Sequence, residues 1–375
     1  FPNTDVALGS MPAPVVSQTQ LKGAVYVADS SSTGHVYAID RATGVLARSY
    51  TLGGTAEFIS SASYAGNVHL FVHQASNQLL KLTDLGGSIT RDSTWSNNPK
   101  SVDAGKLTVP PAFMVESGTR YLYLAAGGAA SPPWDASGVS LQKLYADNGN
   151  KVAGFTESGR RAPEYTEQTT RLLNDQVFTA GASEDWIGEQ LRIFRNDADG
   201  TGEIEFSLYA KLKHVILVRN GNDLFLAPED NWVWRLTSGL VSSTWVLGKS
   251  ADLGGAKHSA AYYTRGTDSI YVGRGNVLYR LNVTNGTVIS SWTQPASGNI
   301  VTPPVLWTTY VYFGTDTGQL FAVNATTNVA RANWPITLDT GAGSTPKVRS
   351  IAFDASFNHV YFSTDEGRVY KFTLE

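Results

Sequence analysis

The 375-residue sequence contains no cysteine, which excludes disulfide frameworks, cysteine-ligated zinc, covalently attached haem and thiol nucleophiles. It also lacks an excess of either charge. Because 29 Lys and Arg residues stand against 32 Asp and Glu residues, no basic field is available to hold a phosphate backbone, and we expect no nucleic-acid partner. No apolar run reaches the roughly 18 residues that span a bilayer, so no transmembrane segment is expected. The chain starts at Phe1 without a basic and apolar leader, from which we expect a mature product.

Short strands rich in β-branched and aromatic residues recur as hairpins along the chain, whereas helical periodicity is nearly absent. The clearest copies pair residues 25–27 with 35–39, 270–272 with 277–281, 311–313 with 319–323, and 360–362 with 368–372. Weaker copies begin near Leu70, Leu122, Val177 and Leu224. Successive copies lie about 41 to 55 residues apart, which is typical of one four-stranded blade of a propeller. The sequence therefore predicts an all-β protein, an eight-bladed β-propeller of four-stranded antiparallel blades, with seven blades as the alternative.

The two ends of the chain predict how such a propeller closes. The last unit supplies only three strands, and Asp5–Gly9 matches in position the outer strand that ends other units. We expect residues 1–10 to supply the closing strand of the last blade, so that residues 1–375 form a single domain without an exposed edge. Pairing of this strand with another subunit would instead build an oligomer or a filament by strand exchange.

Turn residues after several hairpins carry a recognisable repeat. A turn residue is followed six residues later by a Trp at Gly239 and Trp245, Gly286 and Trp292, and Asn328 and Trp334. The turn residue supplies a positive φ, and the Trp is expected to fill the space between neighbouring blades.

Residues 38–44, Ala-Ile-Asp-Arg-Ala-Thr-Gly, and more loosely residues 322–328 resemble the A-x-D-x-x-T-G-x-x-x-W repeat of the PQQ-like, or quinoprotein alcohol dehydrogenase-like, β-propeller superfamily. The resemblance covers essentially the whole chain and implies a propeller similar in architecture to those of WD40 proteins. The dehydrogenases of this superfamily hold PQQ under adjacent half-cystines and beside calcium. Because the chain has no cysteine, the resemblance implies a divergent, non-enzymatic member without a cofactor, located outside the cytoplasm.

One acidic segment follows the residue order of a calcium-binding loop. Its oxygen ligands would be contributed by five residues: Asp197, Asp199, Thr201, Glu203 through its carbonyl, and Glu205. Gly202 permits the sharp turn, but Leu208 stands where such a loop needs its bidentate Glu. The alternative interpretation is an ordinary turn between the third and fourth strands of a blade, and both interpretations stay open.

No catalytic motif is present, and no catalytic residue is predicted. His69 and His73 share one face of a predicted strand, but at about 3.3 Å per residue they are too far apart for one metal ion. We expect the six histidines to be surface or edge residues. Two carboxylates brought together in space could still perform glycosidase chemistry, and that alternative stays open.

Four long connections, at residues 96–107, 127–138, 156–168 and 182–189, are predicted to crowd one sector of one face. Aromatic and Arg residues on such loops are typical of a protein or glycan contact. The candidate contact residues are Trp134, Asp135, Arg160, Arg161, Glu164, Tyr165, Asp185 and Trp186. The alternative is that the two Trp residues only hold their own loops in place.

These observations favour a periplasmic, cell-surface or secreted scaffold that binds a protein or a surface polymer. Three alternatives remain: a quinoprotein-type oxidoreductase or glycan-acting enzyme, a carbohydrate-binding module, and a subunit that assembles by strand exchange.

Overall fold

The structure, a computed structural model, describes residues 15–16, 23–101, 106–107, 110–127, 140–153, 155, 165–166, 171–173, 176–185, 188–197, 204–208, 217–220, 223–226, 231–237, 250–254, 258–264, 269–295, 298–338, 346–354 and 358–374. The chain divides into two compact units, the first comprising Phe1–Gly128, Gly138–Arg160 and Arg349–Glu375, and the second Ala129–Ser137 and Arg161–Val348. A single domain over residues 1–375 stays a prediction.

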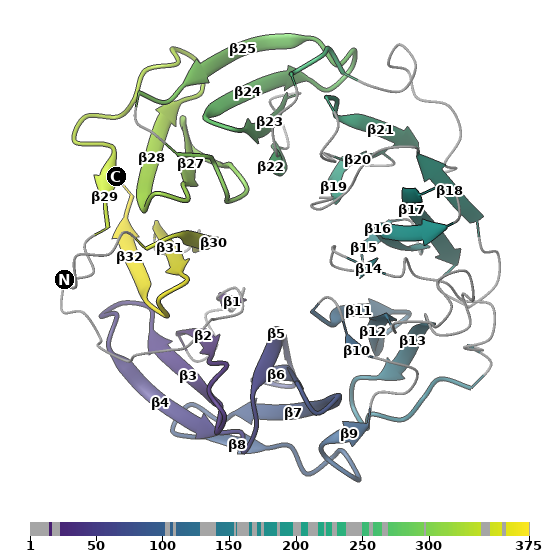
Figure 1. Cartoon of the computed structure of the whole chain (residues 1–375). Coiled ribbons are helices and arrows are strands. Elements are labelled where there is room, and N and C mark those ends of the chain that lie inside the picture. Colours follow the sequence, from purple (N-terminus) through teal and green to yellow (C-terminus); the bar gives the residue numbers. More distant parts are fainter. Residues whose placement is uncertain are drawn as a thin grey trace. The chain divides into compact units, whose positions relative to one another are not determined.

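Four antiparallel sheets of the described residues fall in the first unit (Figure 1). The first contains β1 (Val15–Val16), β2 (Ala24–Ala28), β3 (His35–Asp40) and β4 (Leu46–Thr51). The second contains β5 (Ala56–Tyr64), β6 (Asn67–Gln74), β7 (Gln78–Asp84), β8 (Ile89–Arg91) and β9 (Lys100–Ser101). The third contains β10 (Lys106–Leu107), β11 (Ala112–Glu116), β12 (Thr119–Gly127) and β13 (Ser140–Tyr145). The last along the chain contains β30 (Val348–Asp354), β31 (His359–Thr364) and β32 (Val369–Thr373).

The second unit contains the four remaining sheets of the described residues, which are also antiparallel. One contains β14 (Tyr165–Thr166), β15 (Arg171–Leu173), β16 (Gln176–Asp185), β17 (Gly188–Asp197) and β18 (Ile204–Leu208). The next contains β19 (Leu217–Asn220), β20 (Asp223–Leu226) and β21 (Trp234–Thr237). Two four-stranded sheets follow: β22 (His258–Thr264), β23 (Ser269–Arg274), β24 (Val277–Asn282) and β25 (Val288–Thr293), and then β26 (Val305–Trp307), β27 (Tyr310–Gly314), β28 (Gln319–Asn324) and β29 (Ile336–Thr337).

The structure confirms the hairpins expected from the sequence. Each forms the second and third strands of a sheet; β2 and β3, for example, pair with Tyr26 opposite Ala38, and β31 and β32 pair with Tyr361 opposite Lys371. The weaker copies, β6–β7, β12–β13, β16–β17 and β20–β21, are hairpins as well. Alternation of β-branched or aromatic residues with smaller ones was therefore sufficient to locate them.

The expected turns are also confirmed in detail. Asp40 Oδ1 accepts the Thr43 backbone N–H at 2.7 Å, and Asn282 and Asn324 cap the corresponding turns after β24 and β28. The turn then passes through Gly44, Gly286 or Asn328, each with a positive φ. An Asp or Asn followed by Gly or Asn therefore recurs because it caps and closes this turn.

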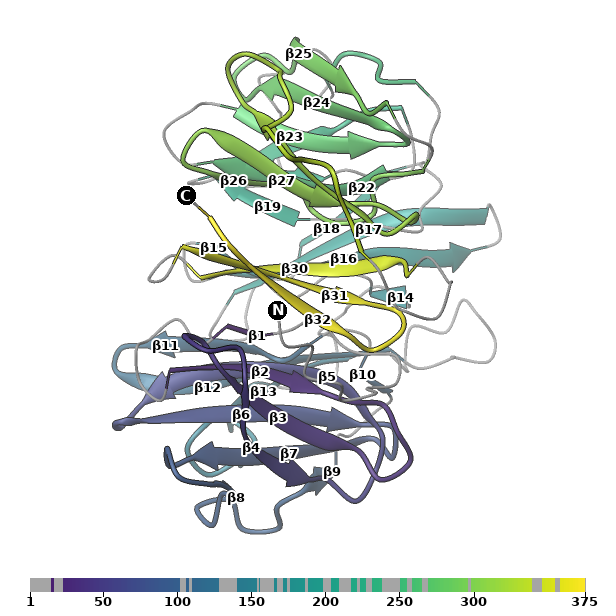
Figure 2. The same ribbon diagram turned by 90° about the vertical axis from the view of Figure 1, so that its left-hand side faces the viewer.

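Neighbouring sheets of the first unit pack face to face. Val25, Val27 and Ile39 of the β1–β4 sheet form one apolar cluster with Tyr361 of the β30–β32 sheet, and these two sheets lie side by side in both views (Figures 1 and 2). The opposite face of the β1–β4 sheet packs on Val68, Leu70 and other residues of the β5–β9 sheet. The β5–β9 sheet in turn packs on the β10–β13 sheet.

Sheets of the second unit pack in the same manner. The β19–β21 sheet shares a core with the β22–β25 sheet, which shares another with the β26–β29 sheet. The Trp292 ring lies 6.0 and 5.5 Å from the rings of Phe313 and Phe321, so this Trp fills the space between two sheets as expected. Trp334 differs, because its ring packs edge-on against Tyr312 of its own sheet.

Two further expectations concern membranes and closure. No helix in the described part of the chain is long and apolar enough to cross a membrane. The predicted closing strand, Asp5–Gly9, lies outside the described residues.

Candidate functional site: a buried charged cluster between two sheets

Most of the contact and calcium residues predicted from the sequence lie outside the described residues. Of the contact residues, Tyr165 falls in β14 and Asp185 in β16, and the outside group is Trp134, Asp135, Arg160, Arg161, Glu164 and Trp186. Of the calcium residues, Asp197 ends β17 and Glu205 lies in β18, and the outside group is Asp199, Thr201 and Glu203. The connection from β17 to β18 follows the third strand of its sheet, as the turn interpretation expected, and the calcium interpretation stays a prediction.

One of the four long connections is not a loop. Residues 182–185 and 188–189 belong to β16 and β17, which pair down to Asp185 opposite Gly188. The sequence prediction was wrong because Gly, Ser, Glu and Asp residues there interrupt the apolar alternation, while the long partner strand still supplies hydrogen bonds.

The histidine prediction was also wrong for β6. His69 and His73 are buried, with 6% and 0% of their surface exposed. His73 Nδ1 lies 3.2 Å from the Glu57 carboxylate. His69 belongs to a larger set of buried polar residues between the β5–β9 and β10–β13 sheets, which includes Lys81, Asp92 and Thr83. We take this set as the candidate site.

Lys81 is the centre of this cluster. It lies in the middle of β7 with only 1% of its surface exposed. Its Nζ is 3.1 Å from Asp92 Oδ2 and donates to Thr94 Oγ1 at 3.2 Å and to the Asp147 carbonyl at 3.3 Å. The rings of Tyr64 and Trp95 lie 5.6 and 5.9 Å from the ammonium nitrogen. A carboxylate, two oxygen acceptors and two aromatic faces thus replace the water that the buried cation loses.

Asp92 and His69 form the inner part of the cluster. Thr83 donates its hydroxyl to Asp92 Oδ2 at 2.6 Å, and the Thr94 backbone N–H donates to Oδ1 at 2.8 Å. His69 Nδ1 lies 3.1 Å from Thr83 Oγ1 and 3.3 Å from Asp92 Oδ2. The His69 ring stacks on Tyr64 with centroids 3.9 Å apart.

The outer part reaches solvent on the neighbouring sheet. Arg120, which is 34% exposed, lies 3.2 Å from the half-exposed Asp147 carboxylate, and its guanidinium carbon lies 4.7 Å from the centroid of the Tyr64 ring. Trp95 Nε1 donates to the Ala146 carbonyl at 2.9 Å. Side chains of one sheet therefore bind backbone oxygens of the next.

Burial and charge pairing shift the pKa values of these groups in opposite directions. Burial lowers the pKa of Lys81 despite the attraction of Asp92. Burial opposes ionisation of Asp92, but hydrogen bonds from Thr83 and Thr94 and the charge of Lys81 outweigh it and hold the pKa of that carboxyl well below its usual range. Burial and then the charge of Lys81 lower the pKa of His69. Asp92 and Lys81 therefore form an ion pair beside a neutral imidazole.

The hydrogen-bond order in the cluster does not match a nucleophilic centre. Such a centre needs a hydroxyl that donates to the imidazole, which in turn donates to the carboxylate. Here the Thr83 hydroxyl donates to Asp92 instead, and His69 Nε2 is buried without a hydrogen-bond partner among the described residues. The described residues also contain no group of three or more His, Asp or Glu that could hold a metal ion. What the cluster's geometry does accomplish is to join two sheets.

Every sheet of the described residues has a position that corresponds to that of Lys81 in strand register. The second strand carries an aromatic residue, and the residue directly opposite in the third strand is a cation or an alanine. The cationic pairs are Phe71–Lys81, Tyr123–Lys143, Phe178–Arg195, Phe225–Arg235, Tyr271–Arg280 and Tyr361–Lys371. The alanine pairs are Tyr26–Ala38 and Tyr312–Ala322.

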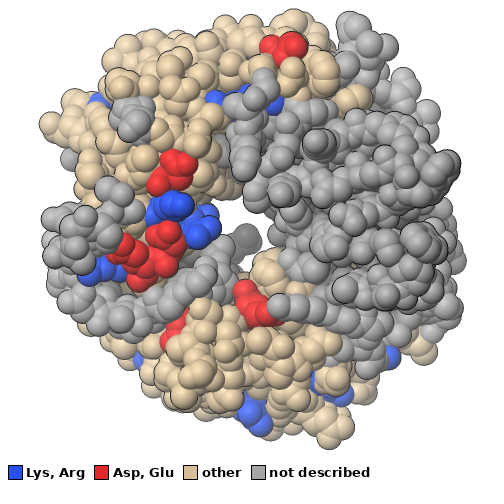
Figure 3. Space-filling view, in the orientation of Figure 1, with Lys and Arg blue, Asp and Glu red and all other residues tan. Residues whose placement is uncertain are grey.

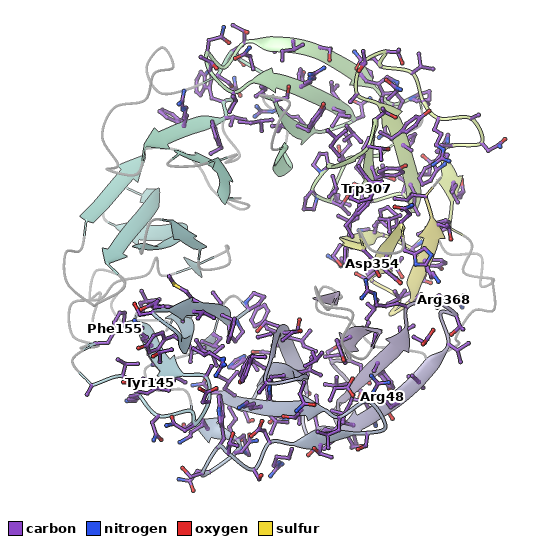
Figure 4. All side chains as sticks on the ribbon, turned by 180° about the vertical axis from the view of Figure 1, so that it is seen from behind. Arg48, Tyr145, Phe155, Trp307, Asp354 and Arg368 are labelled. Atoms are coloured by element: carbon purple, nitrogen blue, oxygen red, sulfur yellow. The ribbon has the colours of Figure 1, made fainter. Side chains whose placement is uncertain are left out.

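The two sheets with alanine obtain the cation from the adjacent outer segment. Arg48 of β4 lies opposite Ala38 and projects from the outer strand (Figure 4), and it forms an ion pair with Asp84, to which Tyr26 also donates its hydroxyl. Arg331 donates its backbone N–H to the Ala322 carbonyl at 2.8 Å, and its side chain lies 3.3 Å from the Tyr312 hydroxyl. All eight sheets of the described residues therefore combine a central aromatic residue with a cation, from one strand or the next.

Four of these cations bind the turn after the third strand of the next sheet. Arg235 donates to the carbonyls of Val283 and Thr284 at 3.4 and 3.3 Å, and Arg280 donates to the Ala325 carbonyl at 3.0 Å. Lys371 donates to the carbonyls of Arg41 and Ala42 at 2.7 and 2.6 Å, so the last sheet uses the turn of the first. Lys81 and Asp147 follow the same pattern.

The sequence analysis did not identify the cations of these pairs, although a sequence pattern marks them. In five of the six third strands with a cation, the cation is followed by Leu or Phe and then by Thr, Tyr or Asn: Lys81-Leu82-Thr83, Lys143-Leu144-Tyr145, Arg235-Leu236-Thr237, Arg280-Leu281-Asn282 and Lys371-Phe372-Thr373. Aligning the hairpins on their turns would have revealed it.

Charged side chains at the surface are arranged differently from the buried cations described above. Acidic and basic side chains gather over the β30–β32 sheet on the face shown in Figure 3. In this sheet, Arg349 of β30 lies 3.9 Å from Asp365, which follows β31. Both residues are solvent-accessible, so this pair is screened and contributes little to stability.

Comparison with known proteins identifies the fold. No family model and no curated protein matches the chain. Three similar solved structures are Sqt1 from Saccharomyces cerevisiae (TM-score 0.65, 99% of this chain and 98% of that chain), the computationally designed Ika8 protein (0.63, 99% and 98%) and BamB from Moraxella catarrhalis (0.61, 100% and 96%), each 12% identical in sequence. BamB is a PQQ-like β-propeller and Sqt1 a WD40 propeller. The chain therefore has a β-propeller fold, as the sequence predicted.

Removal of the Lys81 charge tests the cluster. We expect Lys81→Met to lower the free energy of unfolding by about 3 to 5 kcal/mol, because it leaves the Asp92 carboxylate buried without its cation. Arg120→Met is the matched control, since it breaks a solvent-accessible pair and should cost about 1 kcal/mol or less. Urea unfolding followed by Trp fluorescence measures both, and equal losses would contradict the analysis.

The depressed pKa of His69 predicts a loss of stability in mild acid. Below about pH 6.5 the unfolded chain protonates this histidine while the folded protein keeps it neutral, so stability falls as the pH falls. His69→Gln should flatten this limb by up to about 1.4 kcal/mol per pH unit. Unfolding free energies measured from pH 7.5 to 5 check this, and parallel curves for the two proteins would refute it.

Moving the cation from position 48 to position 38 tests whether a cation beside Tyr26 stabilises the sheet regardless of which strand carries it. Arg48→Ala should cost about 3 kcal/mol, because Asp84 loses its buried partner. Ala38→Lys should be destabilising in the parent but should restore part of the loss in the Arg48→Ala variant, with a favourable coupling of about 1 to 2 kcal/mol. Ala28→Lys, in the same apolar cluster, is the control and should show no such coupling in a double-mutant cycle.

Proposed function

We propose that this protein is a non-enzymatic, eight-bladed β-propeller, completed by its N-terminal segment, that acts outside the cytoplasm as a scaffold for a protein or a surface polymer. The observation that carries the proposal is the repeated aromatic–cation pair. In four of these pairs the cation binds carbonyl oxygens of the neighbouring sheet, and this supports a frame suited to presenting loops rather than to proton transfer.

The loops between the strands carry aromatic and Arg residues that do not belong to the aromatic–cation pairs. The connection from β12 to β13 contains Trp134 and Asp135, and the tip between β16 and β17 contains Trp186. Both join the second to the third strand of a sheet, and such connections emerge at the same end of every antiparallel sheet of this topology. Except for Arg160, the predicted contact residues all fall in the second compact unit. This supports a contact surface confined to one part of the molecule.

A loop variant with a matched surface variant tests the proposal. We expect a partner captured by covalent cross-linking in the source cells to be recovered at least tenfold less by the Trp134→Ala, Trp186→Ala double variant, because large aromatic residues dominate contact energies. Val45→Ser with Val329→Ser is the control, since both valines are exposed, at 49% and 61%, and lie in turns between third and fourth strands. Quantitative mass spectrometry of the cross-linked material measures recovery.

Two results would contradict the proposal. Equal recovery with the loop and control variants would exclude this surface. A bound organic group with the mass of a quinone, found by native mass spectrometry of the purified protein, would favour an oxidoreductase instead.

A further inference from the structure

A small cavity lies between the β22–β25 sheet and the neighbouring β26–β29 sheet, beside the apolar core that these two sheets share. Tyr271, Arg280 and Ser290 line it from the first of these sheets, and Ala325 lines it from the turn after β28. The space between them is about the size of one water molecule. A hydroxyphenyl ring, a guanidinium group and a hydroxyl group therefore face a space that suits one small polar ligand.

The Tyr271 hydroxyl is the buried polar group that needs such a ligand. Tyr271 is 2% exposed, and its hydroxyl makes no hydrogen bond with the described residues. Burial raises the pKa of Tyr271, so the hydroxyl keeps its proton and is available as a donor. A buried donor without an acceptor costs free energy. In the other described sheets with a tyrosine at this register position the hydroxyl has a partner: Tyr26 with Asp84, Tyr123 with Glu116, Tyr312 with Arg331, and Tyr361 with the Arg41 carbonyl.

Arg280 places a positive charge beside the cavity. Its guanidinium group donates to Ser269 Oγ at 2.9 Å and to the Ala325 carbonyl at 3.0 Å, and both acceptors are neutral. No carboxylate of the described residues pairs with this half-buried cation. The cavity therefore combines a hydroxyl donor with a charge that no described acidic side chain balances.

A carboxylate occupies the corresponding place between the β1–β4 and β5–β9 sheets. Asp84 comes three residues after Lys81 along the chain, and it accepts the hydroxyl of Tyr26 in the preceding sheet. Ala325 comes three residues after Ala322, which has the same strand register as Lys81. Ala325 thus stands where the other pair of sheets has its aspartate, and its methyl group cannot accept a hydrogen bond.

The outer strand differs at the corresponding position as well. Ser290 lies opposite Arg280 in β25, as Arg48 lies opposite Ala38 in β4. Arg48 forms the ion pair with Asp84 that fills this place between the first two sheets. The cavity therefore exists because a short serine and an alanine replace an arginine and an aspartate, while Arg280 on the third strand retains the positive charge.

We propose that the cavity binds one small anion of halide size, which takes the place that the Asp84 carboxylate occupies between the first two sheets. The anion accepts the Tyr271 hydroxyl, and its charge balances that of Arg280. A charged acceptor forms a stronger hydrogen bond with a buried hydroxyl than a neutral acceptor does. The size of the cavity excludes polyatomic anions such as sulfate. The inference rests on the register of the described sheets and not on the proposed scaffold role.

Chloride is the probe for the first test. At an ionic strength held constant with gluconate, which is too large for the cavity, we expect the unfolding constant to fall by up to about tenfold for each tenfold rise in chloride, because an anion that binds only the folded protein stabilises it. Urea unfolding followed by Trp fluorescence measures this dependence. An unfolding constant that does not change with chloride would overturn the proposal.

Three variants assign the chloride dependence to the cavity. Tyr271→Phe removes the donor, and Ala325→Asp supplies a carboxylate from the chain, so both should abolish the dependence. Tyr361→Phe is the matched control, because its hydroxyl already has an acceptor, the Arg41 carbonyl. This control should lose stability but keep the full chloride dependence. A dependence that is the same in the parent and in all three variants would place the anion elsewhere and would overturn the site.

Bromide located by anomalous diffraction gives a test that does not rely on stability. In crystals soaked in bromide we expect a peak within hydrogen-bonding distance of the Tyr271 hydroxyl, and no peak in Tyr271→Phe crystals. A water molecule at this place without an anomalous signal would overturn the anion. A bromide bound equally in the variant would be an adventitious ion only and would overturn the site. Because neither test uses a binding partner, the scaffold role can fail while the anion site stands.

Discussion

A cation held between sheets is the interaction on which the described structure depends. A positive charge removed from water is costly unless oxygen acceptors or a carboxylate replace its hydration. Here several of the acceptors lie in the sheet next to the one that carries the cation. Lys81, Arg235, Arg280 and Lys371 each bind carbonyl oxygens in the turn of the following sheet. The cations of these four sheets therefore gain these hydrogen bonds only when the following sheet is present, which couples each of the four to its neighbour in folding.

What the sheets share is a cation beside the central aromatic residue, and the strand that carries this cation can differ. Two sheets have alanine at the usual cation position, and each brings Arg from the next segment to the same aromatic residue. The acceptor also varies, because Arg48 forms an ion pair with the Asp84 side chain whereas Lys81, Arg235, Arg280 and Lys371 donate to backbone carbonyls. In both sheets a cation is therefore kept beside the central aromatic residue, although a different segment of the chain supplies it.

The sequence predicted those features that are set by residues close together in the chain. Hairpins follow from alternation and from turn residues such as Asp40 and Gly44, whose effect is local. The burial of His69 and the hydrogen bond from Lys81 to the Asp147 carbonyl could not be predicted in this way, because both depend on atoms of another sheet. The predicted loop at 182–189 was wrong for a related reason, since the length of a strand is set by its partner as well as by its own residues.

The cluster around Lys81 has the residue types of a catalytic centre but not its hydrogen-bond arrangement. It contains an acid, a histidine, a hydroxyl and a lysine within hydrogen-bonding distance, a set of residues that many catalytic centres share. Its hydrogen bonds nevertheless run from Thr83 and Lys81 to Asp92 and from Lys81 to a backbone carbonyl, so its proton donors serve packing. Lys371 does the same for the last sheet with the carbonyls of Arg41 and Ala42 in the first. The same device therefore joins sheets that are adjacent in the chain and sheets at its opposite ends.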